Sequence, residues 1–187
     1  MSARLDIPQA VAVLRRGGVI AYPTEGVWGV GCDPFNANAV RRLLKIKQRE
    51  EWKGLILVSA DLVQIASLID LDALPAERIR DVRATWPGPH TWLLPCPSRV
   101  PVWLRGMHTT IALRISAHPP VVELCNGFGG PIVSTSANLS GHEAPRAYGQ
   151  LDPALILQID GILAGETGGL ESPTPIHDAA SGMVLRG

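Results

Sequence analysis

The chain has 187 residues, 46% of them hydrophobic and 18% charged, which is typical of one folded globular domain and too apolar for a disordered chain. Seventeen Lys and Arg residues balance 17 Asp and Glu residues, so the net charge gives no reason to expect unspecific nucleic-acid binding. No apolar run could span a bilayer and the first residues lack the pattern of a secretory signal, so we expect a cytoplasmic protein without membrane association. The three widely spaced cysteines indicate neither a disulfide framework nor a zinc site, and we expect them to be reduced, buried thiols.

Helical and strand-like segments alternate along the chain. Asp6 is the expected N-cap of a first helix, with Pro8 in its first turn, and Gly17-Gly18 ends it. Apolar, β-rich runs predict strands, and helical spacing of apolar residues predicts helices. The further expected elements are a strand at 19–22, a helix at 36–48, a strand at 54–60, helices at 61–69 and 75–86, strands at 91–96 and 111–116, a helix at 119–128, a strand at 131–138, and strands in the tail that end in a hairpin across 179–182. The predicted fold is α/β (α+β) with a mixed sheet.

The stretch "AYPTEGVWGVGCDP", residues 21–34, follows the first expected strand and reads as a polar, glycine-rich turn with an exposed-looking Trp28. Open α/β sheets build ligand sites where strands end in such turns. Thr24 offers a hydroxyl and Glu25 a charge, and the glycines permit close backbone approach to a ligand. The alternative is a tight strand connection with Trp28 packed on the core. Neither phosphate-loop pattern, G-x-G-x-x-G or G-x-x-x-x-G-K-[ST], occurs here.

Positive charge gathers between residues 41 and 54, in "RRLLKIKQREEWKG". This stretch holds six basic and two acidic residues, although the whole chain is neutral. It therefore predicts a patch that attracts anions, and the alternative is a solvated helix face that continues into a loop.

Two other polar segments follow expected strands. The first, "STSANLSG" at 134–141, is dense in hydroxyl and amide groups that can surround phosphate oxygens or a small polar substrate, and its alternative role is turn formation and helix capping. The second, "AGETGGLESPTPIHD" at 164–178, predicts either a flexible lid or a surface loop.

The segments "PTEGVWGVGCDP", "LLKIKQREEWKGLILV", "TWPGPHTWLLP", "ALRISAHP" and "PIVSTSANLSG" occur in the order and approximate spacing of the YrdC/Sua5 family. The chain resembles this family over about nine tenths of its length. Its Lys-x-Arg motif, Lys47 and Arg49, and its Ser-x-Asn motif, Ser136 and Asn138, are specific to the family when they occur together. The resemblance implies a twisted, mixed, open sheet around a concave basic cavity. It also implies a single domain over residues 1–187, without the second domain that longer relatives append.

The resemblance implies a nucleotidyltransferase reaction, in which L-threonine, bicarbonate or CO2, and ATP give threonylcarbamoyl-adenylate and pyrophosphate. Mg²⁺ would share in neutralising the ATP phosphates. Downstream proteins would transfer the threonylcarbamoyl group to the adenosine beside the anticodon of tRNA. Because a carbamate oxygen must attack the α-phosphorus, two anions have to be brought together, and cations are needed to offset their repulsion.

The resemblance also places residues in roles. Lys47 and Arg49 are the expected catalytic cations. The other nucleotide-binding residues lie in the basic and polar motifs and are Lys53, Ser134, Ser136 and Asn138. Threonine is expected at the end of the first strand, beside Thr24 and Tyr22. Arg114 is the expected partner of the threonine carboxylate, because a guanidinium can hold a carboxylate by two parallel hydrogen bonds, and its alternative role is that of a surface strand arginine.

No protein metal site is expected. The five histidines, at positions 90, 108, 118, 142 and 177, lack metal-binding spacing and are interpreted as structural or solvent-facing. The tail "ESPTPIHD" departs from the family pattern, so no catalytic role is assigned to Ser172, Thr174 or His177. Gly26 and Trp28 also depart from it, replacing a hydroxyl residue and a tyrosine.

Two alternative functions use the same residues. Weak binding of tRNA or double-stranded RNA, as in a ribosome-maturation factor, would employ the same lysines and arginines, and the neutral chain with 5% aromatic residues argues against it. A carbamoyl-transfer module of hydrogenase-maturation type would require zinc-type cysteine pairs, and the sequence has none.

Overall fold

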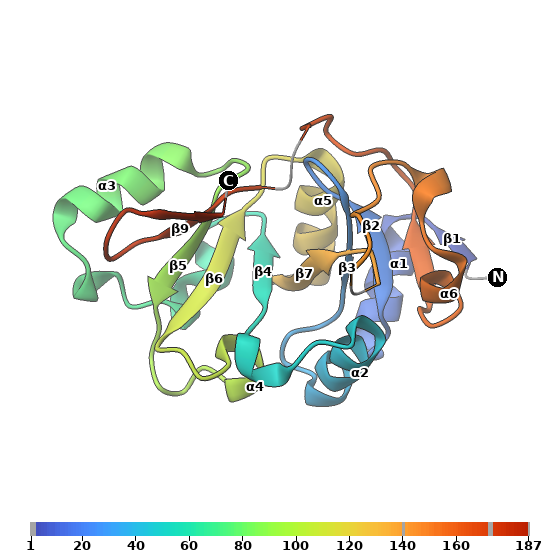
Figure 1. The fold of residues 1–187 in the computed structure, drawn as a ribbon, viewed down its shortest axis with the longest axis horizontal. Coiled ribbons are helices and arrows are strands. Elements are labelled where there is room, and N and C mark those ends of the chain that lie inside the picture. The colour runs from blue at the N-terminus through green and yellow to red at the C-terminus, as the bar shows by residue number, and fades with distance from the viewer. Residues whose placement is uncertain (1–2, 140, 172–173, 187) are drawn as a thin grey trace.

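The computed structural model describes residues 3–139, 141–171 and 174–186. Figure 1 shows a broad, twisted sheet with helices on both sides. The strands are β1 (Ala3–Leu5), β2 (Ile20–Pro23), β3 (Trp28–Gly31), β4 (Ile56–Ser59), β5 (Thr91–Pro95), β6 (Thr110–Ile115), β7 (Ile132–Ser136), β8 (Gly161–Leu163), β9 (Ile176–Asp178) and β10 (Val184–Arg186).

The ten strands form one sheet in the order β1-β8-β2-β3-β7-β4-β6-β5-β9-β10. Parallel pairs, such as β4 with β6 and β5 with β9, alternate with antiparallel pairs, such as β3 with β7 and β5 with β6. The prediction of an α/β fold with a mixed sheet is confirmed. The centre of this order brings together strands from distant parts of the sequence, because β7 lies between β3 and β4.

Within the described residues, six α-helices and four short 3₁₀ segments connect the strands. They are α1 (Ile7–Arg15), α2 (Ala37–Lys47), η1 (Glu51–Lys53), η2 (Val63–Leu68), η3 (Leu71–Ala73), α3 (Ala76–Thr85), α4 (Val102–Arg105), α5 (Pro119–Phe128), η4 (Tyr148–Gln150) and α6 (Pro153–Ile156). Asp6 caps α1 as predicted, because its carboxylate accepts the backbone N–H of Gln9 while the Gln9 side chain accepts the N–H of Asp6. The helix expected at 61–69 is wrong in type, since residues 63–68 form only a 3₁₀ segment.

Apolar side chains fill both faces of the sheet. On one face, α1 and α5 pack against β2, β7 and β8, with Leu14 and Leu124 among the fully buried side chains. On the other face, α2 and α3 cover a larger core that includes Leu43 and Val82. Of the three thiols, Cys32 and Cys125 are buried as expected, and Cys96 is only partly buried.

The stretch at 28–31 is a strand and not part of a turn. β3 pairs with β2 on one side and with β7 on the other, so the turn itself shrinks to residues 24–27. Trp28 is 1% exposed, which corrects the expectation of an exposed ring and supports the alternative of a tight strand connection. Gly31 is required here because a Cβ at this position would lie 1.8 Å from the carbonyl oxygen of Val133 on β7.

The tail closes the fold as a hairpin at the sheet edge. β9 and β10 are antiparallel, as the turn residues at 179–182 predict, and β9 joins the sheet by pairing with β5 (Figure 1). No helix within the described residues combines the length and apolar character needed to cross a membrane.

Candidate functional site

A cavity of about 430 Å³ opens along β6 and is walled by β4, β7, the 24–27 turn and the C-terminal hairpin. Side chains alternate between the two faces of a strand, and Thr110, Ala112 and Arg114 of β6 all line the cavity. The volume lies in the range of small-molecule sites. The cavity therefore extends for about 13 Å along the strand, from Thr110 to Arg114.

Five lysine and arginine side chains line this cavity. They come from four separate parts of the chain and are Arg49, Lys53, Arg105, Arg114 and Arg186. Within the described residues, no Asp or Glu is among the lining side chains. Because the chain as a whole is neutral, this local excess of positive charge indicates an anionic ligand.

Arg49 reaches the cavity because α2 ends just before it. Gln48 adopts the left-handed conformation of a helix C-cap, with φ 48°, and turns the chain away from the helix axis. The Arg49 guanidinium then donates from Nε and Nη2 to the carbonyl oxygen of Gly54, at 3.3 and 2.9 Å. Lys53 adjoins Gly54 in sequence, so the two basic residues meet at one end of the cavity.

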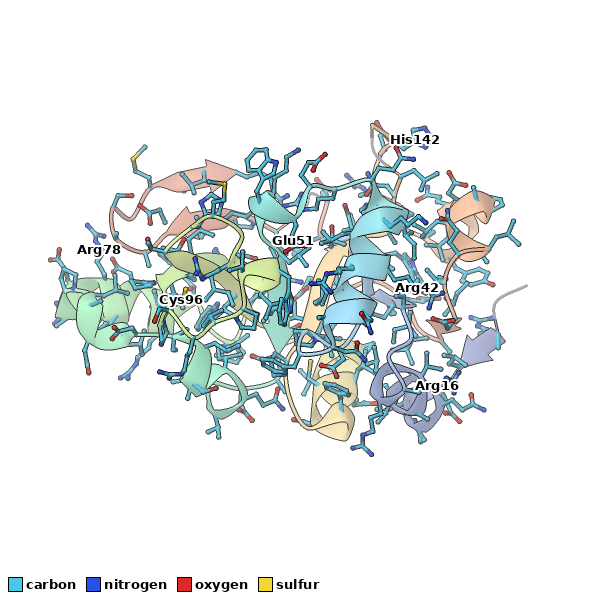
Figure 2. All side chains as sticks on the ribbon, turned by 90° about the horizontal axis from the view of Figure 1, so that it is seen from below. Arg16, Arg42, Glu51, Arg78, Cys96 and His142 are labelled. Carbon is cyan, nitrogen blue, oxygen red and sulfur yellow. The ribbon has the colours of Figure 1, made fainter. Side chains whose placement is uncertain are left out.

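Other basic residues of the same run face solvent. Arg41 and Lys45 are exposed on α2, and Arg42 forms an ion pair with Asp160. Figure 2 shows the labelled Arg42 on α2, on the side of the molecule viewed from below. The two interpretations of the charged run thus each hold for part of it, a solvated helix face before Lys47 and a cavity wall after it.

Lys47 and the Ser-x-Asn motif form one hydrogen-bonded cluster beside the cavity. The Lys47 Nζ donates to the carbonyl oxygen of Ser136 at 2.6 Å, to the carbonyl oxygen of Asn138, and to Asn138 Oδ1 at 3.0 Å. Ser136 Oγ also donates to Asn138 Oδ1, at 2.6 Å. Burial and the neighbouring Arg49 lower the pKa of Lys47 to about 8.

Hydroxyl groups from two strand ends complete the wall near this cluster. Ser134 and Ser136 of β7 line the cavity, and so does Thr24 in the turn after β2. Thr24 Oγ1 donates to the carbonyl oxygen of Val27 at 2.6 Å, which closes the turn. Loop 164–171 docks on the same turn, because Gly168 N–H donates to the Thr24 carbonyl oxygen at 3.0 Å.

Arg114 is 4% exposed and forms an ion pair with the buried Glu25. Its Nε lies 3.3 Å from Glu25 Oε1, which also accepts a hydrogen bond from Ser116 Oγ at 2.7 Å. Arg114 Nη1 donates to the hydroxyls of Thr91 and Thr174, at 3.3 and 2.9 Å. Arg114 is thus a buried, oriented cation and not the surface arginine of the alternative interpretation.

Three of the predicted site residues do not line the cavity. Tyr22 is fully buried in the core behind β2, where its hydroxyl donates to the carbonyl oxygen of Val133 at 2.9 Å, and this burial raises its pKa. Lys47 is 8% exposed and directs its ammonium group at the Ser-x-Asn loop. Asn138 lines a separate polar hollow of about 340 Å³. The expectation that Tyr22 helps to hold threonine therefore lacks support from the geometry.

The histidines divide between the cavity and the scaffold. His108 is exposed, in keeping with its interpretation as solvent-facing, and it also lines the cavity. His90 Nδ1 and His177 Nε2 lie 3.0 Å apart, and the His177 ring stacks on Trp92, so these two are structural as expected. His142 projects from the edge of the molecule in Figure 2. No group of three or more potential metal ligands occurs within the described residues.

Residues 12–187 match the family model that covers Sua5, YciO and YrdC, described as telomere recombination. The protein is a member of this Sua5/YciO/YrdC family. A relative from Stenotrophomonas maltophilia, named threonylcarbamoyl-AMP synthase, is 58% identical over 97% of this chain and 98% of its own. A relative of the same name from Xylella fastidiosa is 52% identical over the full length of both chains.

Solved structures of the Sua5/YciO/YrdC family share the fold. E. coli YciO matches with a TM-score of 0.80 and 28% identity, over 100% of this chain and 95% of its own. P. abyssi Sua5 complexed with L-threonine matches with a TM-score of 0.84 and 29% identity, over 95% of this chain. This chain spans about half, 53%, of that Sua5 chain.

The sequence of this family member gave no local signal for several cavity residues. Arg105 is the last residue of the four-residue helix α4 and Arg186 lies in the last strand, and neither sits in a recognisable motif. Thr174 lines the cavity although no role was assigned to it, and Ser172 lies outside the described residues. Glu25 was noted only as a charge in the turn, and nothing in the sequence indicates its pairing with Arg114.

Proposed function

We propose that this protein is a threonylcarbamoyl-AMP synthase, which converts L-threonine, bicarbonate or CO2, and ATP into threonylcarbamoyl-adenylate and pyrophosphate. Its curated relatives bear this name at 52 to 58% identity. One observation of the structure carries the proposal: five cations converge on a cavity of small-molecule size in a neutral chain, and no carboxylate lies among its described lining residues. A triphosphate and a carbamate are the anions that such a cavity would hold together.

The nucleotide phosphates are assigned to the end of the cavity around Gly54, where Arg49, Lys53 and Arg105 gather. These cations offset the repulsion between the attacking carbamate oxygen and the α-phosphate, and they stabilise the charge that moves onto pyrophosphate. The hydroxyls of Ser134 and Ser136 supply neutral donors to phosphate oxygens. Lys47 acts from behind, by fixing the loop that carries Ser136.

Threonine is assigned to the other end of the cavity, where Thr24 and Arg114 lie. A structure of P. abyssi Sua5 holds L-threonine in the same fold. Arg114 Nη1 already donates to the side-chain hydroxyls of Thr91 and Thr174. Nη2 is therefore the nitrogen assigned to the carboxylate of the substrate. The amine, once deprotonated, attacks CO2, and the resulting carbamate then faces the nucleotide along the length of β6.

Mg²⁺ is assigned to the nucleotide and not to a protein carboxylate cage. The described lining residues offer hydroxyls and no carboxylates, which fits an ion that keeps its waters and binds mainly through phosphates. When bound, the ion would withdraw negative charge from the phosphate oxygens.

The product is assigned to threonylcarbamoyl transfer proteins that modify tRNA, in the cytoplasm. RNA binding by the cavity itself stays an alternative prediction. The cavity cations gather around one volume of small-molecule size, about 430 Å³, which supports the small-molecule function.

The test is pyrophosphate release from Mg²⁺ and ATP, with L-threonine or bicarbonate omitted in turn. Release that requires both substrates is expected for the wild-type protein. Arg49→Gln should reduce kcat/KM for ATP at least about a hundredfold, because it removes a cavity cation. Lys45→Gln is the matched control, since Lys45 is exposed on α2, which ends two residues before Arg49. Threonine-independent release, or equal rates in the two variants, would contradict the proposal.

A further inference from the structure

One of the five cavity cations differs from the others in its partner. Arg114 is paired with a carboxylate, whereas Arg49, Lys53, Arg105 and Arg186 have no ion pair within the described part of the chain. The two ends of the cavity therefore differ in net charge. Around Gly54 the charges of Arg49, Lys53 and Arg105 are uncompensated, whereas Glu25 balances Arg114 at the other end and leaves Arg186, which is bound to the Thr174 carbonyl oxygen, as the uncompensated charge there.

Glu25 is held so that its charge stays beside Arg114. The residue is 7% exposed, its Oε1 accepts one hydrogen bond from Ser116, and its Oε2 has no hydrogen-bond partner within the described residues. Burying a carboxylate with so few donors is costly unless a cation compensates it. Arg114 Nε, at 3.3 Å, supplies that compensation without the geometry of a hydrogen bond.

Two segments fix the Glu25 backbone and side chain. Loop 164–171 reaches it through the Leu170 N–H, which donates to the Glu25 carbonyl oxygen at 3.1 Å. Ser116 fixes the carboxylate from the end of β6, and the same Ser116 Oγ accepts the His118 N–H at 3.1 Å. Glu25 therefore cannot turn away from Arg114 without loss of these contacts.

We infer that Glu25 is a specificity-determining residue, which makes the Arg114 end of the cavity select a zwitterionic amino acid over a phosphate anion. An isolated arginine attracts phosphate as readily as carboxylate. Glu25 lies behind Arg114 and not among the cavity-lining residues, so it lowers the positive potential at this end, which weakens the attraction for a multiply charged phosphate more than that for a zwitterion. Glu25 thereby leaves the ATP phosphates to the uncompensated cations around Gly54.

This inference rests on the proposed function and concerns how its two substrates are kept apart. Five similar cations in one cavity would allow the triphosphate to occupy the threonine position and block the reaction. A negative charge behind one of the cations prevents this, because it repels multiply charged phosphate more than it repels a zwitterion.

The first experiment uses the wild-type protein and measures threonine binding by calorimetry, with inorganic phosphate as the competing probe. We expect phosphate to weaken ATP binding and to leave the threonine Kd within about twofold of its value without phosphate. Equal competition against both substrates would overturn the inference and leave the proposed function standing. Absence of threonine binding would overturn both.

The second experiment repeats the titrations with Glu25→Gln, which keeps the size of the side chain and removes its charge. Phosphate should then compete with threonine and raise its apparent Kd at least about tenfold at the same phosphate concentration. Glu25→Asp keeps the charge and should restore discrimination. Glu166→Gln, an exposed glutamate in loop 164–171, is the matched control.

Loss of a buried ion-pair partner can also unfold a protein, so circular dichroism must show that Glu25→Gln is folded. If it is not, Ser116→Ala serves as the second variant, since it removes the hydrogen bond and retains the carboxylate. This variant should still exclude phosphate from the threonine position. Phosphate competition in Ser116→Ala, or its absence in a folded Glu25→Gln, would overturn the inference.

Discussion

The ammonium group of Lys47 lies 2.6 Å from the carbonyl oxygen of Ser136, and it thereby joins the end of α2 to the loop after β7. The two motifs that are 89 residues apart in sequence form one unit through this contact. Lys47 donates its hydrogen bonds to the loop and does not line the cavity. It thus acts on the site by holding Ser136 in place.

Replacement of Lys47 should destabilise the fold and the site together. Lys47→Met removes the Lys47 donor from the carbonyl oxygens of Ser136 and Asn138 and one of the two donors from Asn138 Oδ1, and we expect a loss of about 2 to 4 kcal/mol in the free energy of unfolding. Urea denaturation measures this loss, and pyrophosphate release should fall in parallel. Lys45→Met, on the exposed face of the same helix, should change neither quantity. An inactive Lys47→Met variant with unchanged stability would instead indicate direct contact with the nucleotide.

The lowered pKa of Lys47 gives a pH dependence with a definite sign. Burial, with Arg49, lowers this pKa from 10.5 to about 8, so the folded protein loses the Lys47 proton well before the unfolded chain does. Between these two pH values the unfolded state binds more protons, and the contribution of Lys47 to the free energy of unfolding rises with pH. Activity should fall over the same range, because the neutral amine cannot satisfy three acceptors.

The measurement is the pH profile of kcat/KM for ATP in the wild type and in Lys47→Arg. The arginine stays protonated, so the alkaline limb of the Lys47→Arg profile should shift to higher pH. Both profiles share the ionisation of the substrates, which makes the comparison a control for them. Identical alkaline limbs would show that Lys47 does not set the loss of activity.

Replacement of Tyr22 should affect the stability of the protein and not its binding of threonine. Its hydroxyl is buried and donates to the Val133 carbonyl oxygen, so Tyr22→Phe should reduce stability by about 1 kcal/mol. The threonine KM should stay within about twofold, because the ring lies outside the cavity. Thermal unfolding and steady-state kinetics measure the two effects. Tyr148→Phe, at 45% exposure, is the control for the substitution, and a selective rise of the threonine KM in Tyr22→Phe would restore Tyr22 to the site.

The local sequence predicts those elements whose signals are local. Asp6 and Pro8 define α1, and the apolar runs define β2, β4 and β7, because capping and hydrophobic patterning depend on neighbouring residues. β3 escapes this reasoning because "WGVG" has two glycines and no alternating polar face. Its strand conformation comes from pairing with β2 and β7, and the β7 pairing joins residues more than 100 positions apart.

Site residues, like strands, could be predicted only where the local sequence carries a signal. Arg49, Lys53 and Ser136 could be predicted because they lie in motifs, and the structure brings them to one cavity. Arg186 could not be predicted, since it arrives through the C-terminal hairpin and is fixed by donating to the Thr174 carbonyl oxygen at 3.1 Å. A contribution of Tyr22 to threonine binding stays a prediction, and its side chain packs in the buried cluster with Leu14 and Leu124 and does not line the cavity.

Arg105 is a cavity cation outside any motif, and its replacement should weaken ATP binding. Its Nε donates to the Val100 carbonyl oxygen and its Nη1 to the His108 carbonyl oxygen, which orient the guanidinium at the end around Gly54. Arg105→Gln should raise the ATP KM about tenfold and leave the threonine KM nearly unchanged, because the charge is lost only at the phosphate end. Steady-state kinetics with each substrate varied in turn separates the two values. Arg99→Gln, at an exposed position nearby in sequence, is the control, and equal effects of the two substitutions would remove Arg105 from the site.

Gly31 couples the packing of the sheet to the geometry of the cavity. A Cβ at this position would lie 1.8 Å from the Val133 carbonyl oxygen and 3.1 Å from the Tyr22 ring, so β7 must shift to accommodate it. Because β7 also carries Ser134 and Ser136, Gly31→Ala should reduce both stability, by about 3 kcal/mol or more, and the rate of pyrophosphate release. Gly149→Ala is the matched control, since a Cβ there meets no atom within 4 Å. Urea unfolding of both variants measures the difference. A Gly31→Ala protein as stable as Gly149→Ala would contradict the expected clash between the added Cβ and the Val133 carbonyl oxygen.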